Sequence, residues 1–362
     1  MTPAVVFGAV FALLGVTLLT NLWHLRRSRP RELRPVSTRR LSVLIPARNE
    51  AENLRRLLPS LLAQDYPDFE VIVHDDGSED GTWEVLSSIH DRRLRAFRGS
   101  GPPSGWVGKV HALYSATREA TGELLLFLDA DVALKHPAAL SQLVAHFERL
   151  PQPAALTGIT HLKGGGQLVV SLVPLVILSL LPIPIAARLR SKRMSALNGQ
   201  CWMIAREDYD RLEPHLQHRD EVLEDIRIGR YLKQRGVEPV MADLQDLIEV
   251  WMYRSVPDAW RGFRKNVYLF MGERWWSFLP LHALYLALLI VPPLVSPWFV
   301  AAWYALKLLS DRFVRCPARI TLATPVSLLL GAALQLDSAL AHWSGRVDWK
   351  GRSVGRAALQ LD

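Results

Sequence analysis

Two acidic clusters have the residue types and the spacing that chemistry on phosphate compounds requires. Asp75-Asp76-Gly77-Ser78 follows the strand-like run 71–74, and Asp129-Ala130-Asp131 follows the apolar run 124–128. A buried carboxylate without a partner is costly, so acids at the ends of buried strands commonly serve a charged or hydrogen-bonding ligand. In an open α/β sheet such ligands bind at the carboxyl ends of the strands. Because a third run, 41–45, leads into Pro46-Ala47-Arg48-Asn49-Glu50, the three strand ends predict a nucleotide site.

The spacing of Asp129 and Asp131 suits a divalent cation. Mg²⁺ and Mn²⁺ prefer carboxylate oxygens together with the phosphate oxygens of a substrate, and the metal neutralises a diphosphate leaving group. An isolated Asp-x-Asp is a weak signal, but the preceding strand and the Asp75-Asp76 pair strengthen it. The alternative is that one of the two acids only caps the next helix.

A further acidic pair, Glu224-Asp225, begins a predicted helix that runs to Gly236. The helix dipole stabilises acids at this position, so structural capping is one interpretation. The functional interpretation is that Asp225 is a general base that takes the proton from an acceptor hydroxyl. One base and one metal-bound leaving group suffice for a single in-line displacement with inversion at the carbon that is attacked.

The elements that must position these residues alternate between strand and helix. From Leu41 onward, short runs rich in β-formers alternate with helical periodicity, which predicts βαβ units and a mainly parallel sheet in an α/β domain. Residues 99–108, rich in Gly and Pro, predict a loop that leads to Lys109, and a helix is expected over 110–121. Lys109 either meets a donor diphosphate or is a solvated loop lysine.

An uncharged segment, residues 4–23, is long enough to cross a bilayer core of ~30 Å. A cleaved signal peptide is disfavoured, because no positive residue precedes the segment and no small-residue cleavage site follows it. Seven arginines and one glutamate occur between His24 and Arg40. By the positive-inside rule, the body of the chain is expected in the cytoplasm, at the inner membrane.

Two further regions are apolar. Segment 167–187 contains three prolines, which favours a re-entrant or interfacial element of short helices; a full span or a buried core helix are the alternatives. Basic residues follow this segment (Arg188, Arg190, Lys192, Arg193) and suit a phospholipid surface. Residues 275–306 carry no charge, and 320–343 carry only Asp337, which is either functional within the membrane or able to reach water.

These features predict four parts. Residues 1–25 form an N-terminal transmembrane helix, 26–274 a cytoplasmic catalytic domain that includes 167–187, 275–345 C-terminal transmembrane helices, and 346–362 a basic tail. The net charge of +8 fits an anionic lipid surface, and since no nucleic-acid motif is present, no nucleic-acid partner is expected. The two cysteines, Cys201 and Cys316, give neither a disulfide framework nor zinc spacing.

The four motifs, in this order and over about residues 40–270, resemble glycosyltransferase family 2. The resemblance implies the nucleotide-diphosphosugar-binding fold called GT-A. It implies that the donor contacts Pro46, Arg48, Glu50, the Asp75-Asp76 pair and Ala130. It also implies that Asp129 and Asp131 bind the metal-diphosphate, that Glu224 lies toward the acceptor, and that Asp225 is the base.

Finer features resemble the membrane-bound carotenoid and related lipid glycosyltransferases of bacteria. These features are Gly105-Trp106-Val107-Gly108-Lys109, Asn198-Gly199-Gln200 and Trp349-Lys350-Gly351-Arg352. Gln200 is expected on the acceptor side, or it is polar filler in a turn. Processive relatives carry a Gln/Arg-x-x-Arg-Trp motif, but the matching stretch here, 261–266, lacks the tryptophan. Arg261 and Arg264 either clamp the diphosphate or face the membrane.

The leading hypothesis is a membrane-anchored, metal-dependent inverting glycosyltransferase that uses a UDP-sugar and Mg²⁺ or Mn²⁺. Its acceptor is expected to be a lipid, either carotenoid- or polyprenoid-like, or a sphingolipid or diacylglycerol. An alternative enzyme transfers the sugar to a polyprenyl phosphate. An alternative of another class is a non-catalytic membrane scaffold, which the presence of Asp131 and Asp225 disfavours.

Overall fold

The computed structural model describes residues 2–30, 38–188, 195, 197–349 and 352–353. The chain divides into two compact units. The α/β unit comprises residues 27–161 and 187–251, and the helical unit comprises residues 1–26, 162–186 and 252–362. The basic cluster at Arg190, Lys192 and Arg193 and most of the basic tail lie outside the described residues, as do Lys350 and Gly351 of the C-terminal motif.

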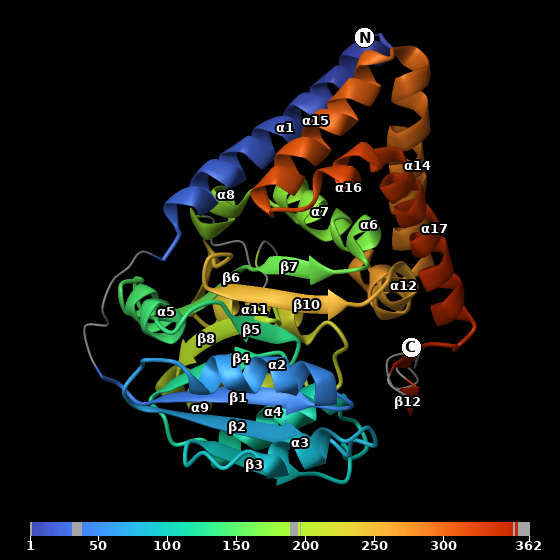
Figure 1. The fold of residues 1–362 in the computed structure, drawn as a ribbon. Coiled ribbons are helices and arrows are strands. Elements are labelled where there is room, and N and C mark those ends of the chain that lie inside the picture. The colour runs from blue at the N-terminus through green and yellow to red at the C-terminus, as the bar shows by residue number, and fades with distance from the viewer. Residues whose placement is uncertain (1, 31–37, 189–194, 196, 350–351, 354–362) are drawn as a thin grey trace. The chain divides into compact units, whose positions relative to one another are not determined.

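A mostly parallel, seven-stranded sheet forms the centre of the α/β unit (Figure 1), in the order β3-β2-β1-β4-β8-β6-β9. Strand β1 pairs in parallel with β2 and β4, while β8 runs antiparallel to both β4 and β6. Nearly every residue of β1, β2 and β4 is buried, as expected for parallel strands covered on both faces. The strand bounds are β1 Leu41–Ala47, β2 Phe69–Asp75, β3 Leu94–Arg98, β4 Leu124–Leu128, β6 Ala154–Ile159, β8 Cys201–Ala205 and β9 Glu238–Asp243. The α/β prediction is therefore confirmed.

The helices of this unit cover both faces of the sheet. The order of the strands reverses after β3, and right-handed crossovers then place α2 and α3 on one face and α4 on the other. Phe127 stacks on Trp202 with ring centroids 4.1 Å apart, in a core shared with residues of α4 and α11. The helices are α2 Ala51–Leu62, α3 Thr82–Ser88, α4 Gly108–Glu119, α5 Ala139–Glu148, α9 Arg206–Leu212, α10 Pro214–Gln217 and α11 Glu224–Gln234.

A short antiparallel ladder continues from the second acidic cluster. Strand β5 (Val132–Leu134) pairs with β10 (Ile248–Tyr253), with Val132 opposite Val250. Ser60 of α2 accepts a hydrogen bond from the backbone N–H of Leu134 at 3.1 Å. The ladder therefore fixes the chain that leaves Asp131 against α2.

The helical unit is built from three separate stretches of the chain. Within the part that the structure describes, three of its helices are long and apolar enough to cross a membrane: α1, α14 and α17. Over the described residues, the apolar segment 167–187 forms three short helices rather than one, as its prolines predicted. The bounds are α1 Pro3–Arg27, α6 Gln167–Val170, α7 Leu172–Leu180, α8 Ile183–Arg188, α12 Val256–Arg264, α13 Val267–Phe270, α14 Trp275–Val295, α15 Trp298–Phe313, α16 Ala318–Leu322 and α17 Thr324–Trp343.

The side chain of Asn21, on α1, forms hydrogen bonds with the backbone at the break between α7 and α8. Its side chain is fully buried, and its Nδ2 donates to the carbonyls of Leu178 and Leu181 at 2.8 and 2.7 Å. Its Oδ1 accepts from the N–H of Ile183 at 2.9 Å. One side chain therefore satisfies three backbone groups that a broken helix leaves without intrahelical partners.

A buried ion pair joins α15 to the short helices. Lys307 and Asp311, one helical turn apart, have fully buried side chains in contact with each other. The Lys307 ammonium also donates to Ser171 at 3.0 Å, and Thr321 donates to Asp311 at 2.8 Å. Every charge in this cluster is thus paired and hydrogen-bonded, which is the condition under which buried ions are tolerated.

The two compact units divide the chain differently from the four expected parts. Residues 162–186 and 252–274, which the sequence pattern places with the catalytic domain, lie in the helical unit. The physical reason is packing: Val169 and Val170 of α6 form one buried cluster with Ala259 and Phe263 of α12 and Leu334 of α17. Glycines 164–166 allow this approach, because a Cβ at Gly165 would collide with the carbonyl of Arg254.

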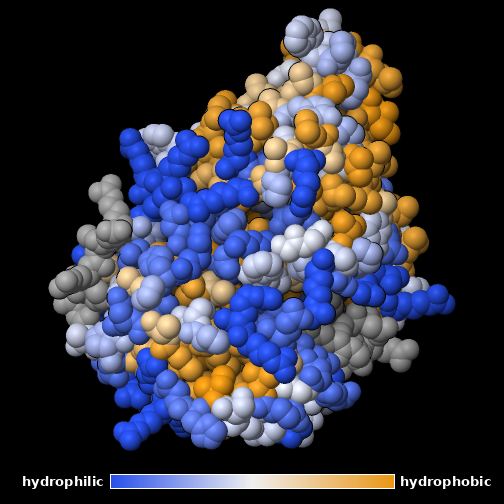
Figure 2. All heavy atoms as spheres, in the orientation of Figure 1, coloured by the Kyte–Doolittle hydropathy of each residue, from blue (hydrophilic) through white to orange (hydrophobic). Residues whose placement is uncertain are grey.

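Apolar side chains also face outward on the helical unit. Figure 2 shows hydrophobic residues gathered over α14 and α15. On α14, Leu294 is 81% exposed, and Trp298, the first residue of α15, is 80% exposed. An uncovered apolar surface of this kind is expected where a helix contacts lipid.

Candidate active site

The loop after β1 meets the loop after β2. The backbone N–H of Asp76 donates to the carbonyl of Ala47 at 2.8 Å. Arg48 donates to the carbonyl of Asp76 at 3.1 Å and lies 3.9 Å from its carboxylate. Asn49 has a φ of 53°, which turns the chain sharply toward Glu50 and the start of α2. Four of the predicted donor-binding residues, Arg48, Glu50, Asp75 and Asp76, therefore lie on adjoining loops.

Asp75 is completely buried at the end of β2. One of its oxygens accepts hydrogen bonds from the N–H and the hydroxyl of Ser78. Its other oxygen lies 4.0 Å from Nε of Arg98, which ends β3 opposite Asp75 in the parallel register. The sequence reasoning missed Arg98, although its position at the end of the next strand was the signal that could have found it.

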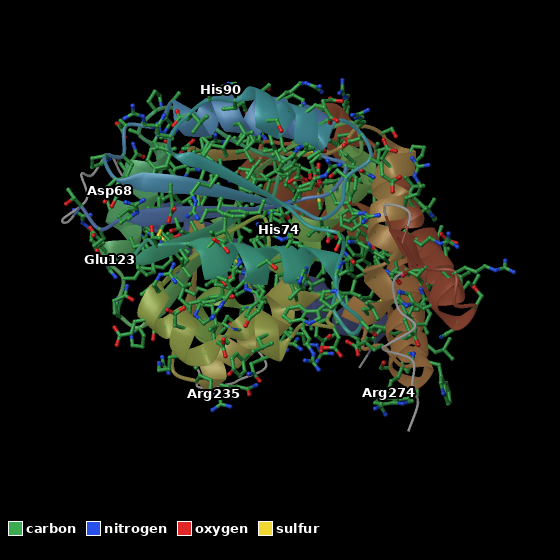
Figure 3. All side chains as sticks on the ribbon, turned by 90° about the horizontal axis from the view of Figure 1, so that it is seen from below. Asp68, His74, His90, Glu123, Arg235 and Arg274 are labelled. Carbon is green, nitrogen blue, oxygen red and sulfur yellow. The ribbon has the colours of Figure 1, made fainter. Side chains whose placement is uncertain are left out.

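A pair of histidines lies beside Asp76. His74 precedes Asp75 on β2, and its ring is nearly perpendicular to that of His111 on α4, with centroids 5.9 Å apart. Figure 3 shows His74 within the body of the α/β unit, whereas Asp68 and Glu123 lie at its rim. Burial lowers the pKa of both histidines, so both are neutral near pH 7. The sequence reasoning did not identify this pair.

Lys109, the second residue of α4, lies among the acids of the site. Its Nζ is 2.7 Å from Oδ1 and 3.0 Å from Oδ2 of Asp129, and 3.1 Å from Oε1 of Glu224. Burial alone would lower the pKa of Lys109, but the Asp129 and Glu224 carboxylates outweigh it and raise this pKa. Lys109 is thus a cation that joins the second acidic cluster to the Glu224-Asp225 pair.

Asp225 lies in the first turn of α11 and is held by backbone donors. Its Oδ2 accepts from the N–H of Gly199 at 3.1 Å, and its Oδ1 accepts from the N–H of Ile226 at 2.8 Å. Burial and the neighbouring Glu224 carboxylate raise the pKa of Asp225 to about 6, against the opposing effect of Lys109. A carboxylate of this pKa is a suitable general base near neutral pH.

Gly199 is the point at which Lys109 and Asp225 come together. A Cβ at residue 199 would lie 3.2 Å from Lys109 Nζ and 3.2 Å from Asp225 Oδ2. The adjacent carbonyl of Gln200 accepts from the N–H of Asp129 at 3.2 Å, while the Gln200 side chain accepts from Thr160 at 2.7 Å. The loop before β8 therefore contacts both Asp129 and Asp225 through its backbone.

Asp129 and Asp131 are the candidate metal ligands. Asp131 is also fixed through its backbone, because its carbonyl accepts from the N–H of Trp251 at 2.8 Å. Among the residues that the structure describes, no group of three or more His, Cys, Asp or Glu side chains is arranged to hold a metal. Two carboxylates one residue apart nevertheless fit an ion that completes its coordination with the diphosphate oxygens of a substrate.

Arg261 and Arg264, the candidate diphosphate clamp, lie on α12 in the helical unit, and each contacts a carboxylate there. Arg261 is paired with Asp258. Nε of Arg264 lies 3.1 Å from Oδ2 of Asp337, and the same Oδ2 accepts a hydrogen bond from Trp260 Nε1 at 2.7 Å. Asp337 thus has two partners on α12.

At one edge of its sheet, the α/β unit brings together acids at strand ends, a bridging lysine at the start of α4 and an acid of raised pKa at the start of α11. This arrangement is suited to a phosphate-containing ligand. The family model described as glycosyl transferase family 2 matches residues 42–212, in agreement with the resemblance of the sequence motifs to that family.

Known proteins agree with this assignment. The chain is 35% identical over 114 residues to a 4,4'-diaponeurosporenoate glycosyltransferase of Staphylococcus haemolyticus, a match over 31% of this chain and 30% of the relative. The enzyme of the same name from Staphylococcus aureus strain USA300 is 33% identical over 108 residues, 30% of this chain and 28% of the relative. The chain therefore matches less than a third of the length of either relative.

The fold has a solved counterpart. A mannosyltransferase from Pyrobaculum calidifontis, in complex with GDP-Man and Mn²⁺, superimposes with a TM-score of 0.53 at 20% identity. The match covers 93% of this chain and 98% of the mannosyltransferase chain. This likeness confirms the predicted glycosyltransferase fold.

Proposed function

We propose that this protein is a membrane-bound, inverting glycosyltransferase that moves a sugar from a UDP-sugar to a lipid acceptor. The observation that carries the proposal is the group formed by Lys109, Asp129, Glu224 and Asp225, in which a base and a cation meet at Gly199. The relatives' name supports a carotenoid-like acceptor. The long apolar helices support membrane attachment, and the seven arginines between residues 24 and 40 support a cytoplasmic position for the α/β unit.

The proposed reaction is a single displacement. Asp225 accepts the proton of the acceptor hydroxyl while the acceptor oxygen attacks the anomeric carbon, and the bond from that carbon to the diphosphate oxygen breaks. The configuration inverts because attack and departure occur on opposite sides. A Mg²⁺ or Mn²⁺ ion at Asp129 and Asp131 would stabilise the charge on the departing diphosphate.

The remaining residues bind and orient the donor. The nucleoside is proposed to bind at the edge of the sheet beside Arg48, Glu50, Asp75 and Asp76. The buried Asp75 carboxylate is suited to accept a hydrogen bond from the base or the ribose. Lys109 holds Asp129 and Glu224 in place before the donor binds, and it is close enough to contact the diphosphate afterwards. Gln200 and Glu224 are proposed to border the acceptor side.

The test uses membranes that contain the full chain. They are incubated with a panel of labelled UDP-sugars, with GDP-mannose and with extracted carotenoid and glycerolipid acceptors. The proposal expects sugar transfer to a lipid, with loss of transfer in Asp225→Asn and normal transfer in Asp220→Asn, an exposed acid that precedes the same helix. Transfer from GDP-mannose alone would contradict the uridine assignment, and transfer that persists in Asp225→Asn would contradict the base.

The acceptor class is read from the product. Treatment that cleaves phosphate esters leaves a neutral glycolipid intact, whereas it releases the sugar from a polyprenyl phosphate. Release would favour the polyprenyl-phosphate alternative. Absence of transfer with every donor and acceptor, from membranes in which the protein is folded, would favour the scaffold alternative.

A further inference from the structure

Trp251 is the cross-strand neighbour of the candidate metal ligand Asp131. The register of β5 and β10 pairs Val132 with Val250, and the hydrogen bond from Trp251 N–H to Asp131 O extends that register by one residue. Residues directly opposite each other in an antiparallel pair place their side chains on the same face. The indole of Trp251 and the carboxylate of Asp131 therefore lie on one face of the ladder.

The indole is held in a fixed position. The guanidinium of Arg56, on α2, lies 4.6 Å from the centroid of the ring. The indole Nε1 donates to Oε1 of Glu249 at 3.2 Å. Arg56 itself is held by Asn53 at 3.3 Å and by Glu52 at 3.6 Å. A ring with a cation over one face and a hydrogen bond at its edge has little freedom to turn.

The same ring remains open to solvent. Trp251 is 36% exposed, more than any other large apolar side chain among the described residues of the α/β unit. A rigidly held aromatic ring that stays accessible beside a candidate metal ligand offers a flat apolar face to a bound ligand. The neighbouring Asp131 indicates which ligand this is, because the group beside a metal-bound diphosphate is the group to be transferred.

We propose that Trp251 is the platform on which the transferred sugar lies, and that it helps to select that sugar. This inference rests on the proposed function. A pyranose has a face of C–H groups that packs against the electron-rich face of an aromatic ring. Arg56 supports the ring from one side, and the sugar covers the accessible part beside Asp131.

The experiment compares a nucleotide with and without its sugar. Detergent-solubilised full-length protein with Mn²⁺ is titrated calorimetrically with UDP and with UDP-glucose, and in parallel with GDP and GDP-mannose. Trp251→Leu is expected to weaken binding of the nucleotide-sugar by about tenfold and to leave binding of the free nucleotide within about twofold of wild type. Trp251→Phe, which keeps an aromatic face, is expected to recover most of the affinity.

Trp298→Leu is the matched control, since it removes an exposed tryptophan from the helical unit; it is expected to change neither affinity. Equal loss of nucleotide and nucleotide-sugar affinity in Trp251→Leu would overturn the inference, and so would a change in the KM for the acceptor alone. A fall in thermal stability with both affinities intact would show a structural role and would also overturn it. Wild-type protein that binds neither pair would contradict the proposed function together with this assignment.

Discussion

The raised pKa of Asp225 predicts that the rate of transfer falls as the pH drops through about 6. A general base acts only when it is ionised. With a pKa of about 6, Asp225 is ionised in about nine tenths of molecules at pH 7 and in about one tenth at pH 5, so kcat/KM should fall about tenfold over that interval. An Asp at its ordinary pKa of 3.8 would remain almost fully ionised at pH 5, and the rate would hardly change.

The surroundings of Asp225 determine the pH at which this fall in rate, the acid limb of the profile, occurs. Burial is the largest cause of the raised pKa, the Glu224 carboxylate adds to it, and Lys109 opposes it. In Glu224→Gln the neighbouring negative charge is gone while Lys109 keeps Asp129 as a partner, so the pKa of Asp225 should fall. The acid limb should therefore move to lower pH, and Glu224→Gln should keep more of its pH 7 rate at pH 5 than wild type does.

The assay is the initial rate of lipid glycosylation at subsaturating donor, which gives kcat/KM, between about pH 4.5 and 8. Glu221→Gln is the control, because it also removes an acid close to Asp225 in sequence, but one that is paired with Arg227 at 3.5 Å; its profile should match wild type. An unchanged limb in Glu224→Gln would refute the electrostatic reasoning. Asp225→Asn should lose about 10²–10⁴-fold, and near-normal transfer would instead indicate an acceptor, such as a carboxylate, that needs no base.

Three further outcomes are expected. Gly199→Ala should reduce kcat with little change in melting temperature, because its Cβ would lie 3.2 Å from both Lys109 Nζ and Asp225 Oδ2; unchanged kcat would contradict the close approach. Chelation with EDTA should abolish transfer and added Mn²⁺ should restore it, whereas transfer indifferent to EDTA would count against the metal roles of Asp129 and Asp131. Lys307→Met should destabilise the protein by about 3–5 kcal/mol because it leaves Asp311 as a buried, uncompensated charge; Lys307→Met/Asp311→Leu should recover much of the melting temperature, and a double variant no better than the single one would be the contrary result.

The sheet edge was predictable because its signals are local. Strands β1, β2 and β4 are short apolar runs, and the residues that follow them are acids or turn formers. A strand end and its first polar residue are adjacent in sequence, so the pattern alone places Asp75 and Asp129 at the same edge.

Contacts between distant segments were not predictable. Lys109, Asp129 and Glu224 come from three separate parts of the chain, and only the packing of α4 against the sheet brings Nζ of Lys109 between two carboxylates. The antiparallel insertion of β8, which brings Gly199 to Asp225, likewise depends on the path of the chain. The packing of α12 with other helices was not predictable either, because α12 is amphipathic and its apolar face packs equally well on a sheet or on other helices.

The three hydrogen bonds of Asn21 have a consequence for how the chain is assembled. In a hydrocarbon setting, the two carbonyls and one N–H at the break after α7 would each cost several kcal/mol without a partner. The segment that contains α7, the break and α8 is therefore stable in such a setting only once α1 is in place beside it. Asn21 is synthesised more than 150 residues before its partners, so the N-terminal helix is available as a template when the later segment folds.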